Sequence, residues 1–309
     1  RTGLQRHRGP QPGQWQMRRA SSSRWSESTH AELAWGRSRA SSVHWAWAGA
    51  LIGILISSIC FVPASWLAGV ISAATQQRFM LADARGTVWS GSATAVLTGG
   101  PGSRDSSALP GRLFWSVQPQ GLALKITLSQ ACCIEGRVGV LLKPGWSGFS
   151  AMLQPETDRI GQWPSRWLTG LGTPWNTLKL GGTIYLQSSG LTLESTNGHW
   201  RISGGMDLEL IDASSSLSTL EPLGSYRLAL QGTPPSEAPD PQTGSTESAL
   251  LTLSTLEGAL LLSGNGTWGA KGLNFRGEAT ARDAGDEALT NLLNIIGRRD
   301  GARSVISIG

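Results

Sequence analysis

Histidine is scarce in this chain, and its scarcity limits the chemistry that the chain can perform. The 309 residues include four histidines, and only His199 lies beyond residue 44. Zinc sites usually draw on several imidazoles or cysteines, and any Ser/His/Asp triad in the C-terminal part would have to use this one residue. His199 stands between Gly198 and Trp200 at an expected hairpin turn, where a structural role accounts for it.

Sequence motifs that mark enzymes are missing as well. The sequence contains no P-loop, no dinucleotide-binding fingerprint, no nucleophile elbow and no helix with paired carboxylates. Its acidic residues are scattered along predicted strands, as on a solvated surface. We therefore predict no catalytic residue, no cofactor-binding residue, no metal ligand and no cofactor, and we expect the chain not to be an enzyme.

Charge is also sparse, and the positive charge is concentrated near the N-terminus. Charged residues make up 15% of the chain, whose formal net charge is +5. Residues 1–42 contain eight arginines against Glu27 and Glu32, a net charge of +6, so the 18 basic and 19 acidic residues that follow sum to −1. The main part of the chain therefore lacks a basic surface, and we expect no nucleic-acid partner.

No charged residue occurs between Arg39 and Arg78, and the centre of this interval, Trp45–Val62, is almost entirely apolar. About 20 mainly apolar residues cross a bilayer as a helix. We predict one helix that spans the inner membrane. The arginine excess before it places the N-terminus in the cytoplasm and the following domain in the periplasm of a Gram-negative bacterium. A signal peptide that is cleaved near Ala74 is the alternative.

These features divide the chain into three parts. We expect a basic cytoplasmic tail over residues 1–42, a transmembrane helix over residues 43–66, and a β-rich periplasmic domain over residues 79–309 with a flexible, proline-rich loop at 232–248. The first methionine of the chain is Met17. We therefore also expect residues 1–16 to be upstream sequence joined through a misplaced start codon.

From Phe79 onward the apolar residues recur mostly at every second position, which is the pattern of half-buried strands. This alternation runs through Leu122–Leu128, Leu180–Leu186, Leu191–Glu194, Trp200–Ser203, Met206–Leu210, Tyr226–Gln231 and Leu251–Ser254. Pairs that favour turns accompany these stretches, namely Ser189-Gly190, Asn197-Gly198, Gly204-Gly205 and Asn265-Gly266. The predicted fold class is mainly β: an N-terminal transmembrane helix followed by an antiparallel β-rich domain with one or two short helices.

Two segments depart from the strand pattern. The run Glu156–Leu171 fits one or two short helices that break at Pro164. Near the C-terminus, Asp286-Glu287 open a clearer helix whose apolar residues recur every three or four positions, with Gly297 as its C-cap. A last strand is expected over Ser304–Ile308.

Cysteine is rare, and tryptophan is abundant. Cys60 lies in the apolar run, whereas Cys132 and Cys133 are adjacent and would either form a disulfide in the periplasm or stay reduced as packing residues. Eight tryptophans follow the predicted membrane helix. Their plain interpretation is packing within a two-layer β domain, and the alternative is an aromatic binding surface.

Short stretches with a characteristic order and spacing run from the end of the apolar segment to the C-terminus. They are Pro63-Ala-Ser-Trp66-Leu67, Ala84-Arg-Gly86-Thr-Val-Trp89-Ser-Gly91-Ser-Ala93, Phe114-Trp115-Ser-Val-Gln-Pro119, Gly182-Thr183, Leu191-Thr-Leu-Glu194, Asn291-Leu-Leu-Asn-Ile-Ile-Gly-Arg-Arg299 and Ser304-Val-Ile-Ser-Ile-Gly309. From about Ala46 to the end, the chain resembles the type II secretion system protein N family, also called general secretion pathway protein N. The resemblance implies a non-enzymatic inner-membrane component of the machine that exports folded proteins, with a periplasmic domain that contacts the secretin or the inner-membrane platform.

Three functions remain open at the level of sequence. The first is a structural subunit of type II secretion that bridges the inner-membrane platform and the outer-membrane secretin or assists their assembly. The second is a membrane-anchored, lipid-handling β scaffold, and the third is a hydrolase built around His199. A closed two-sheet core would favour the first, an exposed apolar trough the second, and a pocket with a serine and a carboxylate beside His199 the third.

Overall fold

The computed structural model of the chain describes residues 43–308 except 197–198, 233–246, 270–271 and 284–286. The chain divides into two compact units, Arg1–Cys60 and Phe61–Gly309, which are described separately. The described part of the first unit is a single helix, Val43–Cys60, with a mean hydropathy of 1.7. Within the described residues it is the one helix that is long and apolar enough to cross a membrane. The predicted tail, residues 1–42, lies outside the described residues.

This first helix ends earlier than residue 66, where the sequence placed its end. Pro63 has an extended backbone and precedes a second helix, α2 (Ala64–Ala74). A proline disfavours the helical conformation for the residue before it and has no N–H to donate, so the chain leaves the helix between Cys60 and Pro63. The predicted segment 43–66 therefore contains the first helix and the start of α2.

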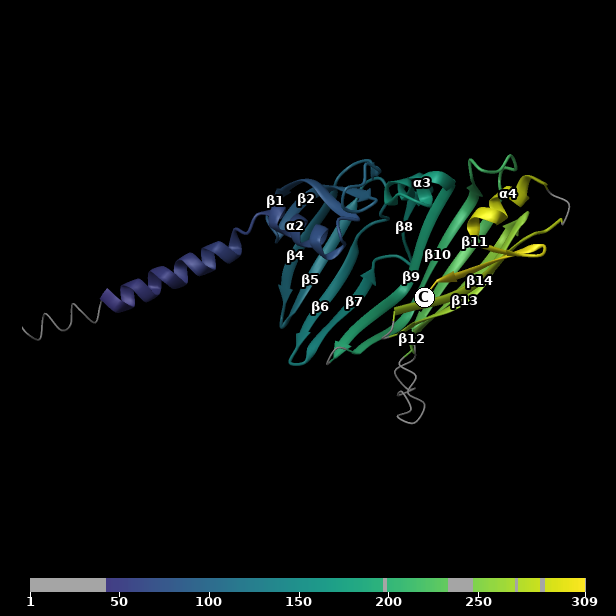
Figure 1. Cartoon of the computed structure of the whole chain (residues 1–309). Coiled ribbons are helices and arrows are strands. Elements are labelled where there is room, and N and C mark those ends of the chain that lie inside the picture. The colour runs from purple at the N-terminus through teal and green to yellow at the C-terminus, as the bar shows by residue number, and fades with distance from the viewer. Residues whose placement is uncertain (1–42, 197–198, 233–246, 270–271, 284–286, 309) are drawn as a thin grey trace, which may run out of the picture. The chain divides into compact units, whose positions relative to one another are not determined.

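The second unit is built on one antiparallel sheet of 16 strands (Figure 1). In chain order the strands are β1 (Phe79–Gly86), β2 (Ser90–Thr98), β3 (Ser106–Ala108), β4 (Leu113–Gln120), β5 (Ala123–Gln130), β6 (Val138–Gly145), β7 (Gly148–Pro155), β8 (Arg159–Pro164), β9 (Gly181–Thr196), β10 (His199–Ser214), β11 (Gly224–Gly232), β12 (Glu247–Gly258), β13 (Leu260–Gly269), β14 (Gly272–Ala281), β15 (Arg298–Asp300) and β16 (Arg303–Ile308). Short helices accompany the sheet: α2, the 3-10 helix η1 (Ser165–Leu171), α3 (Trp175–Leu178) and α4 (Glu287–Ile296). The predicted fold class, mainly antiparallel β with a few short helices, is confirmed.

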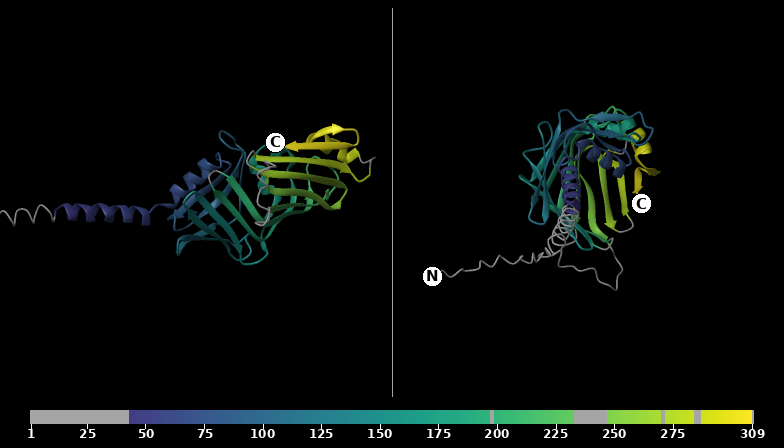
Figure 2. Two further views of the ribbon diagram at one scale, coloured as in Figure 1. Left: turned by 90° about the horizontal axis from the view of Figure 1, so that it is seen from below. Right: turned by 90° about the vertical axis from the view of Figure 1, so that its left-hand side faces the viewer.

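The sheet is a meander, because strands that follow one another in the chain mostly lie next to one another. The order is β1-β2-β4-β5-β6-β7-β9-β10-β11-β12-β13-β14-β16-β15, with β3 paired to β2 and β8 paired to β9. All strands therefore belong to one sheet instead of the two layers expected from the tryptophan content. Figure 2 shows the direction of the strands changing steadily across this sheet, as the right-handed twist of strands requires.

The N-terminal half of the sheet is curved enough for distant segments to meet. The indole Nε1 of Trp167, in η1, donates a hydrogen bond to the backbone oxygen of Ser107, in β3, at 3.0 Å. The amide of Asn176, in α3, donates one to a carboxylate oxygen of Asp105 at 3.0 Å. The segment that follows β8 thus bridges back to β2 and β3, and the sheet between them curves around one of its faces.

Three of the predicted turns are wrong because the glycines lie inside long strands. Ser189-Gly190 falls within β9 and Gly204-Gly205 within β10, where Gly190 pairs with Gly205. Gly190 and Gly204 have φ angles of 131° and 90°, which side chains disfavour, and they accompany a β-bulge that keeps two 16-residue strands continuous. The pair Asn265-Gly266 also lies within a strand, β13. Here the glycine makes room for a neighbour, since a Cβ on Gly266 would lie 2.9 Å from the ring of Phe275.

The other predictions for individual segments have mixed outcomes. The C-terminal helix is confirmed as α4, and the last strand as β16. The helical interpretation of Glu156–Leu171 is wrong before Pro164, because residues 159–164 pair with β9 as a strand, and it is right only for η1. Asn197-Gly198 and most of the 232–248 loop lie outside the described residues, while Gly232 ends β11 and Glu247 begins β12.

An ion-pair cluster holds an irregular turn of β1. Asp83 has a φ of 50°, and its carboxylate accepts hydrogen bonds from Arg112 at 2.7 Å and from Arg85 at 3.2 Å. Arg112 also donates to the backbone oxygens of Asp83 at 2.7 Å and Ser92 at 3.0 Å. The bonds from Arg112 and Arg85 hold the pKa of the Asp83 carboxyl below its usual range, because they favour its charged form.

Candidate interaction surface

One face of the sheet is apolar across most of its width, and we call it the apolar face. Strand pairing brings its side chains into continuous rows: Leu193 pairs with Ile202, and Leu208 pairs with Leu228, which pairs with Leu253. Other members of the same face are Ile126, Val140, Leu142, Leu153, Leu191, Met206, Leu230, Leu251 and Ile306. The period-two alternation in the sequence produces this face directly, because successive side chains point to opposite sides of a strand.

The opposite side, the polar face, carries the charged residues of the same strands. Arg227 forms a salt bridge with Asp207 at 2.5 Å and lies 3.9 Å from Glu209, all on β10 and β11. The hydrogen bond from Arg227 to Asp207 raises the pKa of the guanidinium further above neutrality. The polar face therefore suits water, and its composition distinguishes it clearly from the apolar face.

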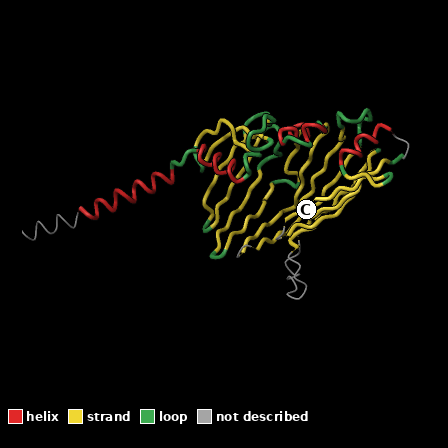
Figure 3. Tube along the Cα trace, viewed as in Figure 1, coloured by secondary structure: helices red, strands yellow, loops and turns green. Residues whose placement is uncertain are grey.

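Short helices and loops cover parts of the apolar face at one end of the strands. Helix α4 buries Leu289, Leu292 and Leu293 against β10, β11, β13 and β14, leaving each of them 2% exposed or less. The hydroxyl of Tyr226 donates to the backbone oxygen of Leu260 at 3.0 Å in this cluster, and burial raises the pKa of Tyr226. We call this end of the sheet, where η1, α3 and α4 lie, the helix end (Figure 3).

The middle of the apolar face is different, because only strand residues form its cluster. Ile202, Leu230 and Ala249 are buried there, and Leu191, Leu193, Met206 and Leu251 pack against them. All belong to β9, β10, β11 and β12, so no described helix contributes to this cluster. Within the apolar face, the partly buried residues of this cluster most resemble the exposed apolar trough that would favour a lipid-handling scaffold.

The end of the sheet opposite the helix end, which we call the turn end, exposes apolar side chains. Here β1 turns into β2, β4 into β5, and β6 into β7. Leu122 is 94% exposed and Trp146 is fully exposed, each in one of these turns. Phe149 and Trp200 are also exposed and make an edge-to-face ring contact with centroids 5.7 Å apart. Exposed large apolar groups gathered at one place usually mark a contact with a partner.

The tryptophans thus fall into both of the classes considered from the sequence. Trp115 is 5% exposed and its indole donates to the backbone oxygen of Val88 at 3.1 Å, so it packs in the core. Trp146, Trp200 and Trp268 are exposed near the turn end. Periodicity could not separate these classes, because it reports the face on which a residue lies and not whether another element covers it.

The second unit begins at the turn end. The backbone N–H of Val88, in the turn between β1 and β2, donates to the oxygen of Val62 at 3.0 Å. Pro63 forms an isolated bridge with Thr87 in the same turn. These contacts fix the chain that directly follows Cys60 to the end of the sheet at which Leu122 and Trp146 are exposed.

The one histidine considered for chemistry lies at the start of a strand. His199 is the first residue of β10, and its side chain lies outside what the structure describes. Among the described residues no group of three or more His, Cys, Asp and Glu side chains is arranged to hold a metal ion. The predicted absence of catalytic, cofactor and metal residues therefore stays a prediction.

Cys132 and Cys133 form a disulfide, one of the two states that the sequence left open. It lies in the turn between β5 and β6, where Cys133 packs against Ala95 and Leu109. The backbone oxygen of Cys133 accepts a hydrogen bond from Gln162 of β8 at 2.8 Å. The disulfide turn therefore helps to hold β8 in place, which is a structural role.

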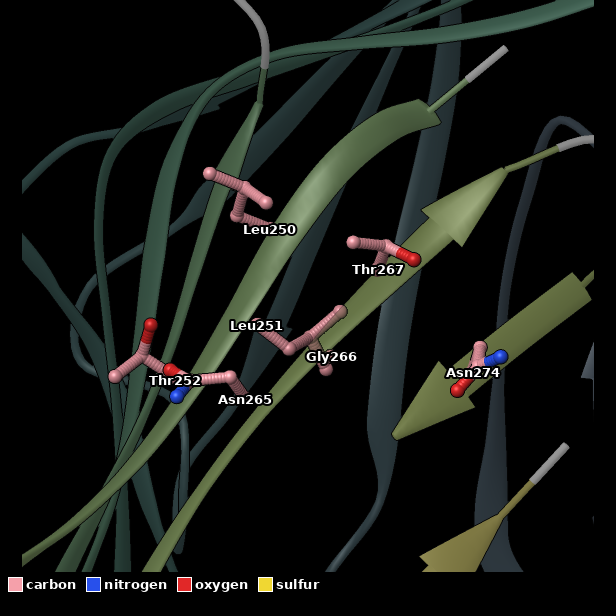
Figure 4. Close-up of a pocket in the computed structure, with 7 residues that line it drawn as sticks. All are labelled: Leu250, Leu251, Thr252, Asn265, Gly266, Thr267 and Asn274. Carbon is pink, nitrogen blue, oxygen red and sulfur yellow. The ribbon is translucent and has the colours of Figure 1, made fainter. Parts of the chain in front are cut away.

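A shallow hollow of about 450 Å³ lies over β12, β13 and β14 (Figure 4). Its lining residues are Leu250, Leu251, Thr252, Asn265, Gly266, Thr267 and Asn274. Most of them belong to the polar face, and none carries a charge or a strong nucleophile. The hollow can donate and accept hydrogen bonds, and it offers no general acid or base. Nothing in the sequence pointed to it, because its residues come together only through strand pairing.

Comparisons with known proteins identify the chain. Searches among curated proteins and solved structures found no significant match. The family described as Type II secretion system (T2SS), protein N, matches residues 77–306, about three quarters of the chain and nearly the whole sheet. The resemblance noted in the sequence is thereby confirmed, and the chain belongs to the type II secretion system protein N family.

Proposed function

We propose that the chain is a single-span inner-membrane subunit of the type II secretion machinery that bridges the inner-membrane platform and the outer-membrane secretin or assists their assembly. Membership of the family implies a role in type II secretion, as a structural component associated with the inner membrane. The single observation that carries the proposal is that the matched region, residues 77–306, follows closely after an apolar helix of membrane-spanning length.

The proposed topology places residues 1–42 in the cytoplasm and the sheet in the periplasm. The net charge of +6 before the Val43–Cys60 helix and the near-neutral sequence after it support this orientation. A periplasmic location also agrees with the Cys132–Cys133 disulfide, since disulfides persist in oxidising compartments. We propose that the domain acts by binding other subunits instead of transforming a substrate.

Crosslinking in living cells followed by purification of the full chain tests the bridging role. The expected result is co-purification of the secretin or of a platform subunit. A matched control chain that ends at residue 76 keeps the apolar helix and lacks the matched region, and we expect it to lose these partners. If the full chain recovers neither partner from cells whose secretion machine is intact, the bridging role is wrong.

A second candidate function, a lipid-handling scaffold, is favoured by the strand-only cluster of the apolar face. Its side chains are the kind that shield acyl chains, and no described helix packs on them. Leu251 and Thr252 are neighbours on β12 that belong to opposite faces. A photo-crosslinking residue at position 251 in the full chain should capture phospholipid, and one at 252 should not. Equal capture at both positions, or none at either, would exclude this candidate.

A further inference from the structure

We infer that the turn end of the sheet docks on the lipid surface of the membrane that the Val43–Cys60 helix crosses. The surface consists of the turns β1–β2, β4–β5 and β6–β7, with Leu122 and Trp146 as its most exposed side chains. The occupant is the bilayer interface itself. The inference rests only on the helix spanning a membrane, and it holds or fails independently of which secretion subunits the chain binds.

The tether supplies the first reason. Cys60 ends the apolar helix, and Val62 and Pro63 are already fixed to the β1–β2 turn through Val88 and Thr87. Only Phe61 lies between Cys60 and Val62, so the Cα atoms of these two residues are at most about 7.6 Å apart, two steps of about 3.8 Å. The β1–β2 turn must therefore stay within about 10 Å of the residue at which the apolar helix ends.

Strand pairing places the other two turns at the same end of the sheet, farther along the strand direction than the β1–β2 turn. Adjacent strands lie about 4.8 Å apart, so the β4–β5 and β6–β7 turns, which are two strands apart, are separated by about 10 Å. The pairing of Leu124 with Leu142 places these two turns at the same end of β5 and β6 (Figure 1). Ser90 pairs with Ser116, so β4 runs four residues past the β1–β2 turn, about 13 Å at 3.3 Å per residue. Leu122 and Trp146 therefore lie along the same end of the sheet as the turn that holds Val62, at increasing distance from it.

The charge distribution supplies the second reason. The three turns between β1 and β7 at this end, residues 87–89, 121–122 and 146–147, contain no charged residue. Farther along the sheet, the connections from β11 to β12 and from β13 to β14 carry Glu237, Asp240 and Lys271. The connections at the helix end carry Arg104, Asp105, Glu135, Arg137, Glu156 and Asp158. Placing a charge in the apolar layer of a bilayer is costly, whereas tryptophan and leucine favour the interface and the acyl boundary. The uncharged turns suit lipid, and the charged connections suit water.

Lys143 adds a detail that fits a lipid surface. It is the charged residue nearest to Trp146 along the chain, and it is exposed in β6 on the polar face. A lysine a few residues from an inserted tryptophan can extend its ammonium group to the lipid headgroups. The turn end then combines apolar residues that enter the interface with a cation beside it.

Fluorescence in a reconstituted bilayer tests the inference with the full chain. Cys60 is replaced by alanine, and a polarity-sensitive fluorophore is attached to Trp146→Cys, just before β7, or, as the matched control, to Thr157→Cys, just after β7 at its other end. Vesicles contain phospholipids that are either normal or brominated near the headgroup. The probe at 146 should emit at shorter wavelength and lose intensity with brominated lipid, and the probe at 157 should do neither.

Two outcomes would overturn the inference. Equal, water-like emission from both probes, without quenching by brominated lipid, would mean that the turn end stays in solvent. Protection of the probe at 146 only after purified secretion subunits are added would mean that the turn end binds protein instead of lipid. Because replacing Trp146 could itself weaken docking, Leu122→Cys is measured in the same way, and it should report the same contact.

Discussion

The helix end and the turn end are opposite ends of one sheet, and they differ in whether their apolar side chains are buried. At the helix end, α4 buries Leu289, Leu292 and Leu293, and the connections between strands are charged. At the turn end, Leu122 and Trp146 stand exposed on uncharged turns. Water around the whole domain would favour polar side chains at both ends. The contrast therefore indicates that the two ends meet different surroundings.

The same chemical change should have a large effect at the helix end and a small one at the turn end. Leu292→Ala should lower the free energy of unfolding by about 2–5 kcal/mol, because it leaves a cavity in the α4 cluster. Leu122→Ala should change it by no more than about 0.5 kcal/mol, because the side chain is exposed. Urea unfolding of the full chain in detergent measures both. Similar losses for the two variants would show that the turn end is packed, and the comparison would fail.

Gly91→Ala sharpens the comparison by testing how firmly the β1–β2 turn is held. A Cβ at this position would lie 2.5 Å from the Trp115 ring, whose indole bonds the turn at Val88. The overpacking should cost about 1–3 kcal/mol. Gly69→Ala in α2, where a Cβ meets nothing within 4 Å, is the control and should be neutral or slightly stabilising. Thermal unfolding curves that coincide for the two variants would contradict a rigid turn.

The disulfide turn at the helix end should contribute little to stability. Linking adjacent residues closes a very short loop, so the restriction of the unfolded chain is small, about 1 kcal/mol in the chain-entropy model. The double substitution Cys132→Ser with Cys133→Ser should therefore lower the unfolding free energy by about 1 kcal/mol or less. Unfolding of the chain on mild reduction would show that the turn holds β8 far more strongly than its loop length indicates.

The Asp83 cluster should give a small effect that depends on pH. The pKa of the Asp83 carboxyl is lower in the folded chain than in the unfolded chain. The stability that its ion pairs contribute is therefore present above the unfolded pKa of about 4 and is lost as the pH falls through the folded value. Asp83→Asn should lower the melting temperature at pH 7 and differ less from the parent at pH 3. Asp158→Asn, at an exposed connection, is the control. An Asp83→Asn deficit that persists at pH 3 would assign the role to shape instead of charge.

Much of this fold follows from local sequence patterns. The apolar helix, the strand alternation and α4 were predicted because each depends on neighbours within one segment. The sequence predicts turns at Gly190 and Gly204, and the structure shows strands there, because a glycine that shapes a bulge and one that ends a strand look alike in sequence. Strand β8 was missed because its conformation comes from pairing with β9. The exposed turn end was not predicted either, since exposure depends on which faces the helices cover.

The central claim is a single span with the sheet in the periplasm, and site-directed labelling in cells tests it most directly. A cysteine is placed at Thr157, in the connection between β7 and β8, or at Ser22 in the tail, in a chain that carries Cys60→Ala. A membrane-impermeant maleimide is added to cells whose outer membrane has been opened. The account predicts that Thr157→Cys reacts at once and that Ser22→Cys reacts only after the inner membrane is broken. Labelling of Ser22→Cys in cells with an intact inner membrane, or loss of the chain from the membrane fraction, would contradict it.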